Sequence, residues 1–248
     1  VQEVVAQDIT RTDNGVTVNN GDRHDIYAGT VSGDNAVNRF KNFELDENHI
    51  ANMYFHTKNT PDMEAKNLLN FIDNRVSING TINAIQNKKI GGNLFFLFKD
   101  GLVVGKSGVI NAGTFSAMPI RNDIAVDMID IRRASEYMAL DSNLMDLSGT
   151  IDIYGQINTA NGIRLKAGRA VNIGGTQNNR LVKAGLRTGL IDFGNVVNIK
   201  NADGTVKTDS GLSGEQLQAT RLANNDIVLG MKAGSVQLTA EATHANAS

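Results

Sequence analysis

The chain has 248 residues, of which 41% are hydrophobic, 5% aromatic and 20% charged, with a formal net charge of −2 and no cysteine. Its lysines and arginines are scattered, which argues against a nucleic-acid partner, and no apolar run approaches the roughly 20 residues of a membrane-spanning helix. The lack of cysteine excludes disulfides, thiolate metal sites and thiol nucleophiles, and it fits either a reducing compartment or a chain that crosses an oxidising one unfolded.

The first 60 residues contain no repeat but include two apolar segments. Residues 36–45 place Phe40 and Phe43 three positions apart, and residues 50–55 supply a second apolar strand. The open end of a stacked β structure exposes unpaired backbone and apolar side chains. We therefore predict that residues 1–60 form an N-terminal cap.

The next segment, residues 61–76, carries two conflicting patterns. After Pro61 the apolar residues follow helical spacing, and Asp62 is a candidate helix N-cap. Phe71 and the β-branched end at Val76 favour a strand instead. The sequence therefore leaves both a helix and a strand as alternatives for residues 61–76.

A short phrase of the form Gly-x-Ile-Asn recurs at 80–83, 108–111 and 155–158, with a weaker copy at 149–152. Its irregular spacing indicates insertions between copies, and residues 61–120 are predicted to form the early coils of a stacked structure. The asparagines are interpreted as ordinary corner residues, with a stacked amide ladder as the alternative. The repeat positions are Gly80, Ile82, Asn83, Gly108, Ile110, Asn111, Gly155, Ile157 and Asn158.

Residues 87–115 join an unusually apolar run, Leu94–Phe98, to short strands punctuated by glycine. Aromatic side chains beside short strands are usually core, and a partner-binding surface is the alternative. Gly101 and the sequence Gly105-Lys106-Ser107 imitate a phosphate-binding loop. The spacing is one residue short, however, and strand residues follow, so this interpretation is rejected.

Residues 121–146 interrupt the β pattern. The segment 123–146 is rich in helix formers and contains no glycine. We predict a helix here, packed as an excursion on the flank of the stacked strands.

From Ile151 onward the apolar residues alternate with polar ones, which predicts short strands with one buried face. Glycines between them suit the corners of a coiling chain. We favour a parallel β-helix over an antiparallel sandwich or barrel, because the strands are short and the phrase repeats in register. Residues 147–248 are predicted to form further coils with a hairpin near 196–208. The alternating residues are Ile151, Ile153, Ile157, Ile163, Leu165, Val171 and Ile173.

Several segments resemble the secretion domain of two-partner-secreted exoproteins, the group that includes filamentous haemagglutinin and the high-molecular-weight adhesins. These segments are Val37–Phe43, Asn74–Ile82, Asn93–Gly101 and Gly105–Asn111. The similarity is closest to the leukotoxin-type filamentous adhesins of anaerobic bacteria. It extends through Lys89–Leu94, Val104–Gly113, Thr188–Phe193 and Ser210–Gly214.

This resemblance implies one secretion domain over residues 1–248, folded as a right-handed parallel β-helix with cap strands. It implies an outer-membrane transporter partner with periplasmic docking domains, and a location outside a Gram-negative cell as part of an adhesin or cytotoxin that acts in virulence. Any host-cell contact would come from the rest of the exoprotein. The start at Val1 fits either signal-peptide removal or a chosen boundary, and the alternating residues 236–242 predict that the coils continue past Ser248.

The resemblance also supplies candidate residues for partner recognition or capping. The sequence Phe98-Lys99-Asp100-Gly101-Leu102 stands where many family members carry Asn-Pro-Asn-Gly-Ile, so partner specificity is expected to diverge at this turn. The candidates are Asn38, Phe40, Phe43, Phe98, Lys99, Asp100, Gly101 and Asn111.

The alternative function is a β-helical polysaccharide-degrading enzyme or a carbohydrate-binding module. Asp127, Asp130, Arg132 and Arg133 resemble the acidic and basic site residues of polysaccharide lyases, but a solvated helix face explains them more simply. Acidic residues do not recur at a fixed distance from the repeated phrase. We therefore predict no enzymatic activity, no cofactor and no metal site.

Overall fold

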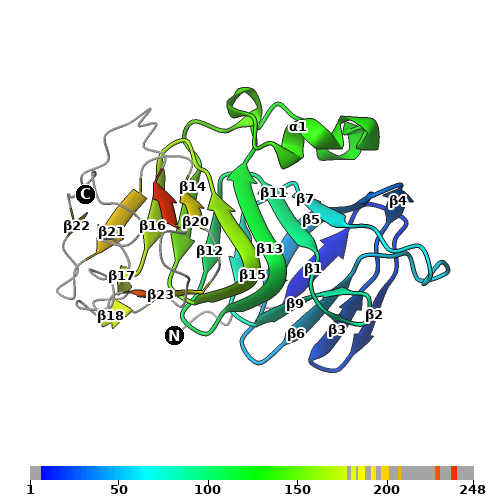
Figure 1. Ribbon diagram of the computed structural model, residues 1–248, viewed down its shortest axis with the longest axis horizontal. Coiled ribbons are helices and arrows are strands. Elements are labelled where there is room, and N and C mark those ends of the chain that lie inside the picture. Colours follow the sequence, from blue (N-terminus) through cyan, green and yellow to red (C-terminus); the bar gives the residue numbers. More distant parts are fainter. Residues whose placement is uncertain are drawn as a thin grey trace.

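The computed structural model describes residues 7–177 continuously. Beyond them it describes only the strand segments 180–182, 184–187, 191–193, 197–200, 206–207, 227–229 and 236–238. The described chain is mostly β-strand, and nearly all strands join one mixed, largely parallel sheet (Figure 1). The all-β prediction is confirmed at this level.

The parallel strands form three stacks, named here A, B and C, and β5, β13 and β15 each pass from one stack into another. Stack A contains the first half of β5 (Asn35–Leu45), β7 (Asn67–Ile72), β11 (Asn93–Phe98), the second halves of β13 (Val109–Pro119) and β15 (Gln156–Leu165), β20 (Ile191–Phe193) and β24 (Val236–Leu238). Stack B contains the second half of β5, β8 (Val76–Ile78), β12 (Gly101–Val104), β14 (Thr150–Ile153), β16 (Ala170–Ile173) and β21 (Val197–Lys200). Stack C contains β3 (Arg23–Ile26), β6 (Ile50–Tyr54), β9 (Thr81–Gln86), the first halves of β13 and β15, β19 (Ala184–Arg187) and β23 (Ile227–Leu229).

From β5 onward the chain visits the stacks in the fixed order A, B, C and then A again. The remaining strands pair antiparallel. They are β1 (Asp8–Arg11) and β4 (Thr30–Ser32) on β5, β2 (Thr17–Asn20) on β3, β10 (Lys89–Ile90) on β9, β17 (Gly175–Gln177) on β18 (Arg180–Val182), and β22 (Val206–Lys207) on β21. The pairing of β21 with β22 is the one that the predicted hairpin requires.

Strands β1, β2 and β4 lie at the N-terminal ends of the stacks, with reversed direction. Within the predicted cap, residues 1–60, the capping strands are therefore β1, β2 and β4, whereas β3, β5 and β6 already belong to the stacks. Residues 61–76, left open between helix and strand, contain β7 and the first residue of β8. Strand pairing on both sides of β7 decides the outcome here, because tertiary pairing overrides a local helical spacing.

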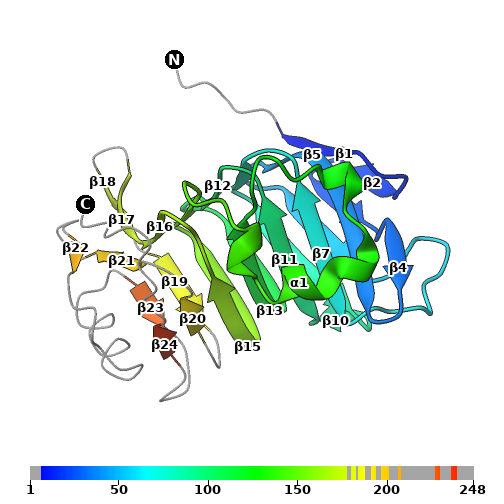
Figure 2. The ribbon, with the colours of Figure 1, turned by 90° about the horizontal axis from the view of Figure 1, so that it is seen from above.

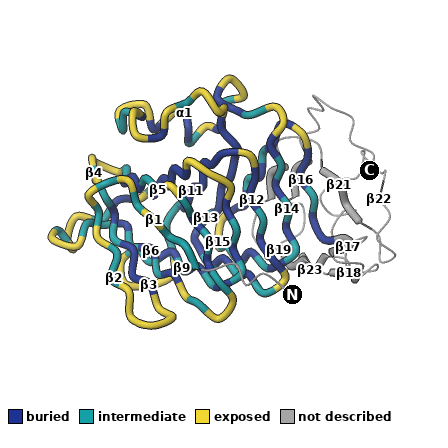
Figure 3. The backbone as a smooth tube through the Cα atoms, turned by 180° about the vertical axis from the view of Figure 1, so that it is seen from behind, coloured by how far each residue is buried: buried dark blue, intermediate teal, exposed yellow. Residues whose placement is uncertain are grey.

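The main core lies between the three stacks, where residues in register place apolar side chains in rows. Figure 3 shows the buried residues along the backbone of these strands. Burial at about 25 cal/mol per Å² of apolar surface stabilises this interior. All seven alternating residues from Ile151 to Ile173 have no exposed surface, so the prediction that they share a buried face is confirmed. The inward row of stack C, for example, contains Ala51, Ile82, Ile110 and Ile157.

The glycine of the repeated phrase stands where the chain turns from stack B into stack C. A Cβ on Gly155 would lie 2.3 Å from the carbonyl oxygens of Gly105 and Gly108, and one on Gly80 would lie 2.4 Å from those of Asp46 and His49. These distances are shorter than any side chain tolerates. The repeat thus marks corners where successive turns of chain touch through their backbones.

Residues 120–147 leave the stacks and cross the outer face of stack A, as the view from above shows (Figure 2). A second core forms there, in which Phe71 and Tyr137 meet edge to face with ring centroids 5.0 Å apart. The predicted flank packing is observed, but a continuous helix is not. The helical segments are α1 (Ala134–Met138) and single 3₁₀ turns at Val126–Met128, Ile131–Arg133 and Ser142–Leu144.

Aspartates break the expected helix of residues 123–146. The side chains of Asp130 and Asp141 accept hydrogen bonds from the backbone N–H two residues later, so each starts a new turn. Leu140, with φ +51°, ends α1. None of the helices in the described part of the chain has the length and apolarity needed to span a bilayer.

Candidate functional site

The predicted aromatic candidates lie inside the main core. Phe40, Phe43 and Phe98 have no exposed surface, and Phe43 makes edge-to-face contacts with Phe40 and Phe96, each at 5.2 Å between ring centroids. In the folded chain these rings are inaccessible to a partner. Any recognition through them is confined to the chain before it folds.

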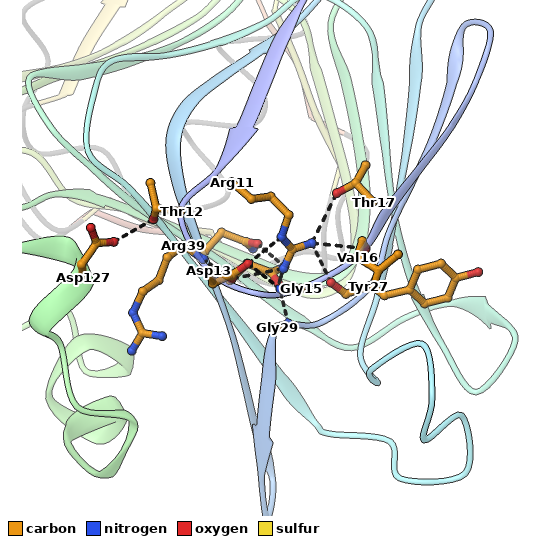
Figure 4. Close-up of polar contacts among 12 residues, drawn as sticks. Arg11, Thr12, Asp13, Gly15, Val16, Thr17, Tyr27, Gly29, Arg39 and Asp127 are labelled. Carbon is orange, nitrogen blue, oxygen red and sulfur yellow. Dashed lines mark hydrogen bonds and ion pairs between the residues drawn. The ribbon is translucent and has the colours of Figure 1, made fainter.

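The N-terminal cap is held by a buried arginine that the sequence analysis did not single out (Figure 4). The side chain of Arg11 is 8% exposed and that of Asp13 is 7% exposed, and their Nε and Oδ1 atoms are 2.7 Å apart. Arg11 also donates to the Tyr27 carbonyl oxygen at 2.8 Å, and its guanidinium lies 5.4 Å from the centroid of the Phe40 ring. One side chain thus connects β1, the residue after β3, and β5.

Burial by itself would raise the pKa of Asp13. The side-chain hydrogen bond and charge of Arg11, with backbone N–H donors from Arg39 and Gly15, outweigh it and hold that pKa below its ordinary value. Asp13 is therefore ionised in the folded protein at neutral pH. A buried ion pair with all its partners present makes this end of the molecule sensitive to the loss of either residue.

Asn38, a predicted recognition residue, belongs to the same network. Its side-chain oxygen accepts from Arg11 Nη2 at 2.6 Å and from the Gly29 N–H at 2.9 Å. Its amide nitrogen donates to Asn70 Oδ1 at 3.0 Å, and Asn70 in turn donates to the Phe95 carbonyl oxygen. Asn38 and Asn70 have no exposed surface, so in the folded chain Asn38 links the cap to the next two strands of stack A.

The turn Lys99-Asp100-Gly101 contains one buried and one exposed side chain. Lys99 is 4% exposed and donates through Nζ to the carbonyl oxygens of Arg121, at 2.7 Å, and Ile124. Burial lowers the pKa of Lys99, although nearby Asp73 opposes the shift. Lys99 therefore holds the excursion onto the sheet and is not available to a partner in the folded chain.

Asp100 is the exposed residue of this turn and adopts φ +64°, a left-handed conformation that Asp tolerates better than most residues. The following Gly101 is buried, and its N–H donates to the Lys99 carbonyl oxygen at 2.7 Å. Of the three residues predicted to set partner specificity here, only Asp100 presents its side chain to solvent.

The repeat asparagines form the most regular polar feature of the surface. Asn83, Asn111 and Asn158 lie inside strands of stack C, at equivalent register positions. The interpretation as corner residues is wrong, because each amide bonds to the one before it. Asn158 donates to Asn111 at 2.9 Å, Asn111 donates to Asn83 at 3.0 Å, and Asn83 donates to Asn52 at 3.1 Å.

This amide ladder ends on a carboxylate in the cap. Asn52 donates to Asp25 Oδ1 at 3.0 Å, and Arg23 lies 3.3 Å from the other oxygen of Asp25. Every amide in the row therefore donates toward the N-terminus. Asn52, Asn83 and Asn111 each accept from the next asparagine of the ladder, whereas Asn158 accepts from Gln156 at 3.1 Å. A second ladder follows the edge of stack A and consists of Asn35, Asn67, Asn93 and Thr114.

The residues that resemble a lyase site make local contacts. Asp130 pairs with Arg132, whose hydrogen bonds lower the pKa of Asp130 to about 2, and Arg133 pairs with Glu136. Asp127 accepts a hydrogen bond from Thr12. Within the described residues, no group of three or more His, Cys, Asp or Glu side chains is arranged to hold a metal ion. These contacts fix turns of the excursion and place it beside the cap.

Three features therefore stand out. The Arg11 network holds the N-terminal end, the amide ladder follows stack C, and the excursion covers the outer face of stack A. No family model, no curated protein and no solved structure matches the chain.

Proposed function

We propose that the chain is a right-handed parallel β-helix that serves as the secretion domain of a large adhesin or cytotoxin exoprotein. In this role it targets the exoprotein to an outer-membrane transporter with periplasmic docking domains, and it nucleates folding of the chain at the cell surface. Virulence and host contact belong to the exoprotein as a whole.

The observation that supports the proposal is that the molecule is closed at its N-terminal end and extends from there in one direction. Its N-terminal end is closed by antiparallel strands and by the Arg11 network, whereas each later strand of the three stacks pairs in parallel with one already placed. A chain that emerges N-terminus first could then add strands to an existing edge, which avoids much of the loop-closure cost of long-range pairing. The absence of cysteine supports passage of an unfolded chain, since no disulfide can close a loop in it.

The test is export from a Gram-negative host, with and without an outer-membrane transporter that carries periplasmic docking domains. Ile110 and Ile157 point into the core and have no exposed surface, so replacing either with Asp should abolish folding and export together. Ile90, 49% exposed in the β9–β10 hairpin, offers the matched control, and Ile90→Asp should leave export intact.

Several results would overturn this function. Failure of the wild-type chain to be exported with the transporter, or equal export without it, would remove the targeting role. Normal export of an unfolded Ile110→Asp chain would separate export from folding. Release of unsaturated ends from pectic or uronate polymers would instead favour the polysaccharide-degrading alternative.

A further inference from the structure

Two histidines meet at the capped end of stack C, a place to which the proposed function assigns no role. His24 lies on β3 in register with Ala51, the first member of the inward apolar row, and is 6% exposed. It therefore occupies the terminal position of the core that Ala51, Ile82 and Ile110 continue. A titratable ring stands where the rest of the row is aliphatic.

Both ring nitrogens of His24 are engaged. Nδ1 lies 2.6 Å from the side-chain oxygen of Asn19, on the neighbouring strand β2, and Nε2 lies 2.8 Å from Nδ1 of His49. The Asn19 oxygen can only accept, so Nδ1 of His24 carries a proton and its Nε2 is the acceptor in the neutral ring. His49 must then donate through its Nδ1–H.

This geometry accommodates one extra proton but not two. A proton added at Nε2 of His49 leaves the shared hydrogen bond in place. A second, on Nε2 of His24, would set two N–H groups against each other across 2.8 Å and place two like charges beside the core. The pair is therefore stable when neutral or singly charged and is broken when doubly charged.

The charged neighbours of the pair come from few elements. Burial is the largest influence on the pKa of His24 and lowers it, the charge of His49 lowers it further, and the carboxylates of Asp22 and Asp25 oppose the shift. Strand β6, on which the hairpin lies, contributes Tyr54 as its one ionisable side chain. Because the pKa is lowered in the folded state, stability from this site is complete above the unfolded value of about 6.5 and is lost as pH falls below it.

We propose that His24 and His49 form a pH-sensitive latch that frees the β2–β3 hairpin from β6 in acid and exposes the end of the core. The latch governs the tip of the hairpin, where the Ile50 N–H donates to the Asp22 carbonyl oxygen at 2.8 Å. The base of the hairpin is held separately, because Arg11 donates to the carbonyl oxygen of Tyr27. The hairpin therefore opens about Tyr27.

The experiment is hydrogen exchange of the amides of residues 17–26 in the full chain, corrected for intrinsic rates, between pH 7.5 and pH 5. Because the pKa of His24 is lowered in the folded chain, protonation favours the open state, and the wild-type opening constant should be larger at pH 5 than at pH 7.5. His24→Leu continues the aliphatic row and should remain protected at both pH values. His56→Asn is the matched control, since His56 contacts Tyr27 and Tyr54 but no second histidine in the described residues, and it should behave as the wild type.

A second readout keeps the proposal testable if His24→Leu fails to fold. The imidazole resonances of His24 should titrate at a higher pH in His49→Ala than in the wild type, because the charge of His49 lowers the pKa of His24. A His24 titration that is unchanged in His49→Ala, or an opening constant that is the same at pH 7.5 and pH 5, would overturn the latch. Either result would leave the secretion role untouched, because that role is measured by export.

Discussion

Replacing an asparagine in the middle of the amide ladder with aspartate is the most direct test of how much the ladder contributes to stability. In Asn111→Asp the new side chain can still accept from Asn158, but it cannot donate to the Asn83 oxygen while ionised. Two oxygen atoms would then face each other across the gap of 3.0 Å that now holds a hydrogen bond. The substitution changes little in volume, so packing is preserved while one donor is lost.

The expected magnitude follows from the half-buried position of the ladder. A hydrogen bond contributes about 0.5–1.5 kcal/mol net, and an unsatisfied buried group costs about 1–3 kcal/mol. Since water reaches part of this row, we expect Asn111→Asp to lower the free energy of unfolding by about 1–3 kcal/mol at neutral pH. Asn111→Ala, which loses both bonds, should cost about the same at every pH.

The pH dependence of the stability cost of Asn111→Asp distinguishes the loss of one hydrogen bond from a general disruption of packing. Only the protonated carboxyl can donate to Asn83, so its pKa in the folded state should lie above the unfolded value of about 3.9. The cost of Asn111→Asp is therefore present above the folded pKa and is relieved as pH falls through it.

Urea unfolding at about pH 7 and about pH 4, each relative to the wild type, measures this difference. Asn161→Asp adds the same charge at an exposed position of β15 and should change stability by no more than about 0.5 kcal/mol. The ladder argument fails if Asn111→Asp costs no more than this control at neutral pH. It also fails if the cost is the same at both pH values.

Two further predictions concern the fastening of the cap and the flank. Arg11→Met should lower the free energy of unfolding by about 3–5 kcal/mol at neutral pH, because it leaves Asp13 buried without its partner, and Arg11→Met/Asp13→Leu should recover most of the loss in urea unfolding. The stability that Asp13 supplies in the wild type should fall as pH drops below about 3.9, since its folded pKa is lowered. Tyr137→Ala should destabilise the excursion by about 3–5 kcal/mol, and limited proteolysis should then cleave residues 120–147 faster while the main transition in urea moves less. If proteolysis of residues 120–147 and the main urea transition instead showed the same loss of stability, the excursion and the stacks would unfold as one unit.

The features that sequence patterns predicted well are those set by local alternation. The row from Ile151 to Ile173 follows a period of two, which a strand with one buried face imposes on its own residues, and all seven predicted positions are buried. The excursion was located by its helix formers. Its break into short turns depends on where Asp130 and Asp141 accept from the backbone, which composition does not reveal.

The polar networks were harder to predict because their partners are far apart at variable spacing. Successive members of the ladder from Asp25 to Asn158 are 27, 31, 28 and 47 residues apart, since turns of the chain differ in length and one of them contains the excursion. The irregular spacing of the repeated phrase is thus the result of insertions between the strands of stack C. Arg11 gave no signal, because its acceptors on Tyr27 and Asn38 lie 16 and 27 residues away.

The single direction of the amide ladder gives the molecule an electrostatic axis. Each side-chain amide is a dipole, and all four point their N–H groups toward Asp25. Aligned dipoles add along the row, as they do along a helix, and a carboxylate at the positive end is the stabilising arrangement. Asp25 thus acts as the counter-charge of a side-chain dipole that extends over the four asparagines from Asn158 to Asn52.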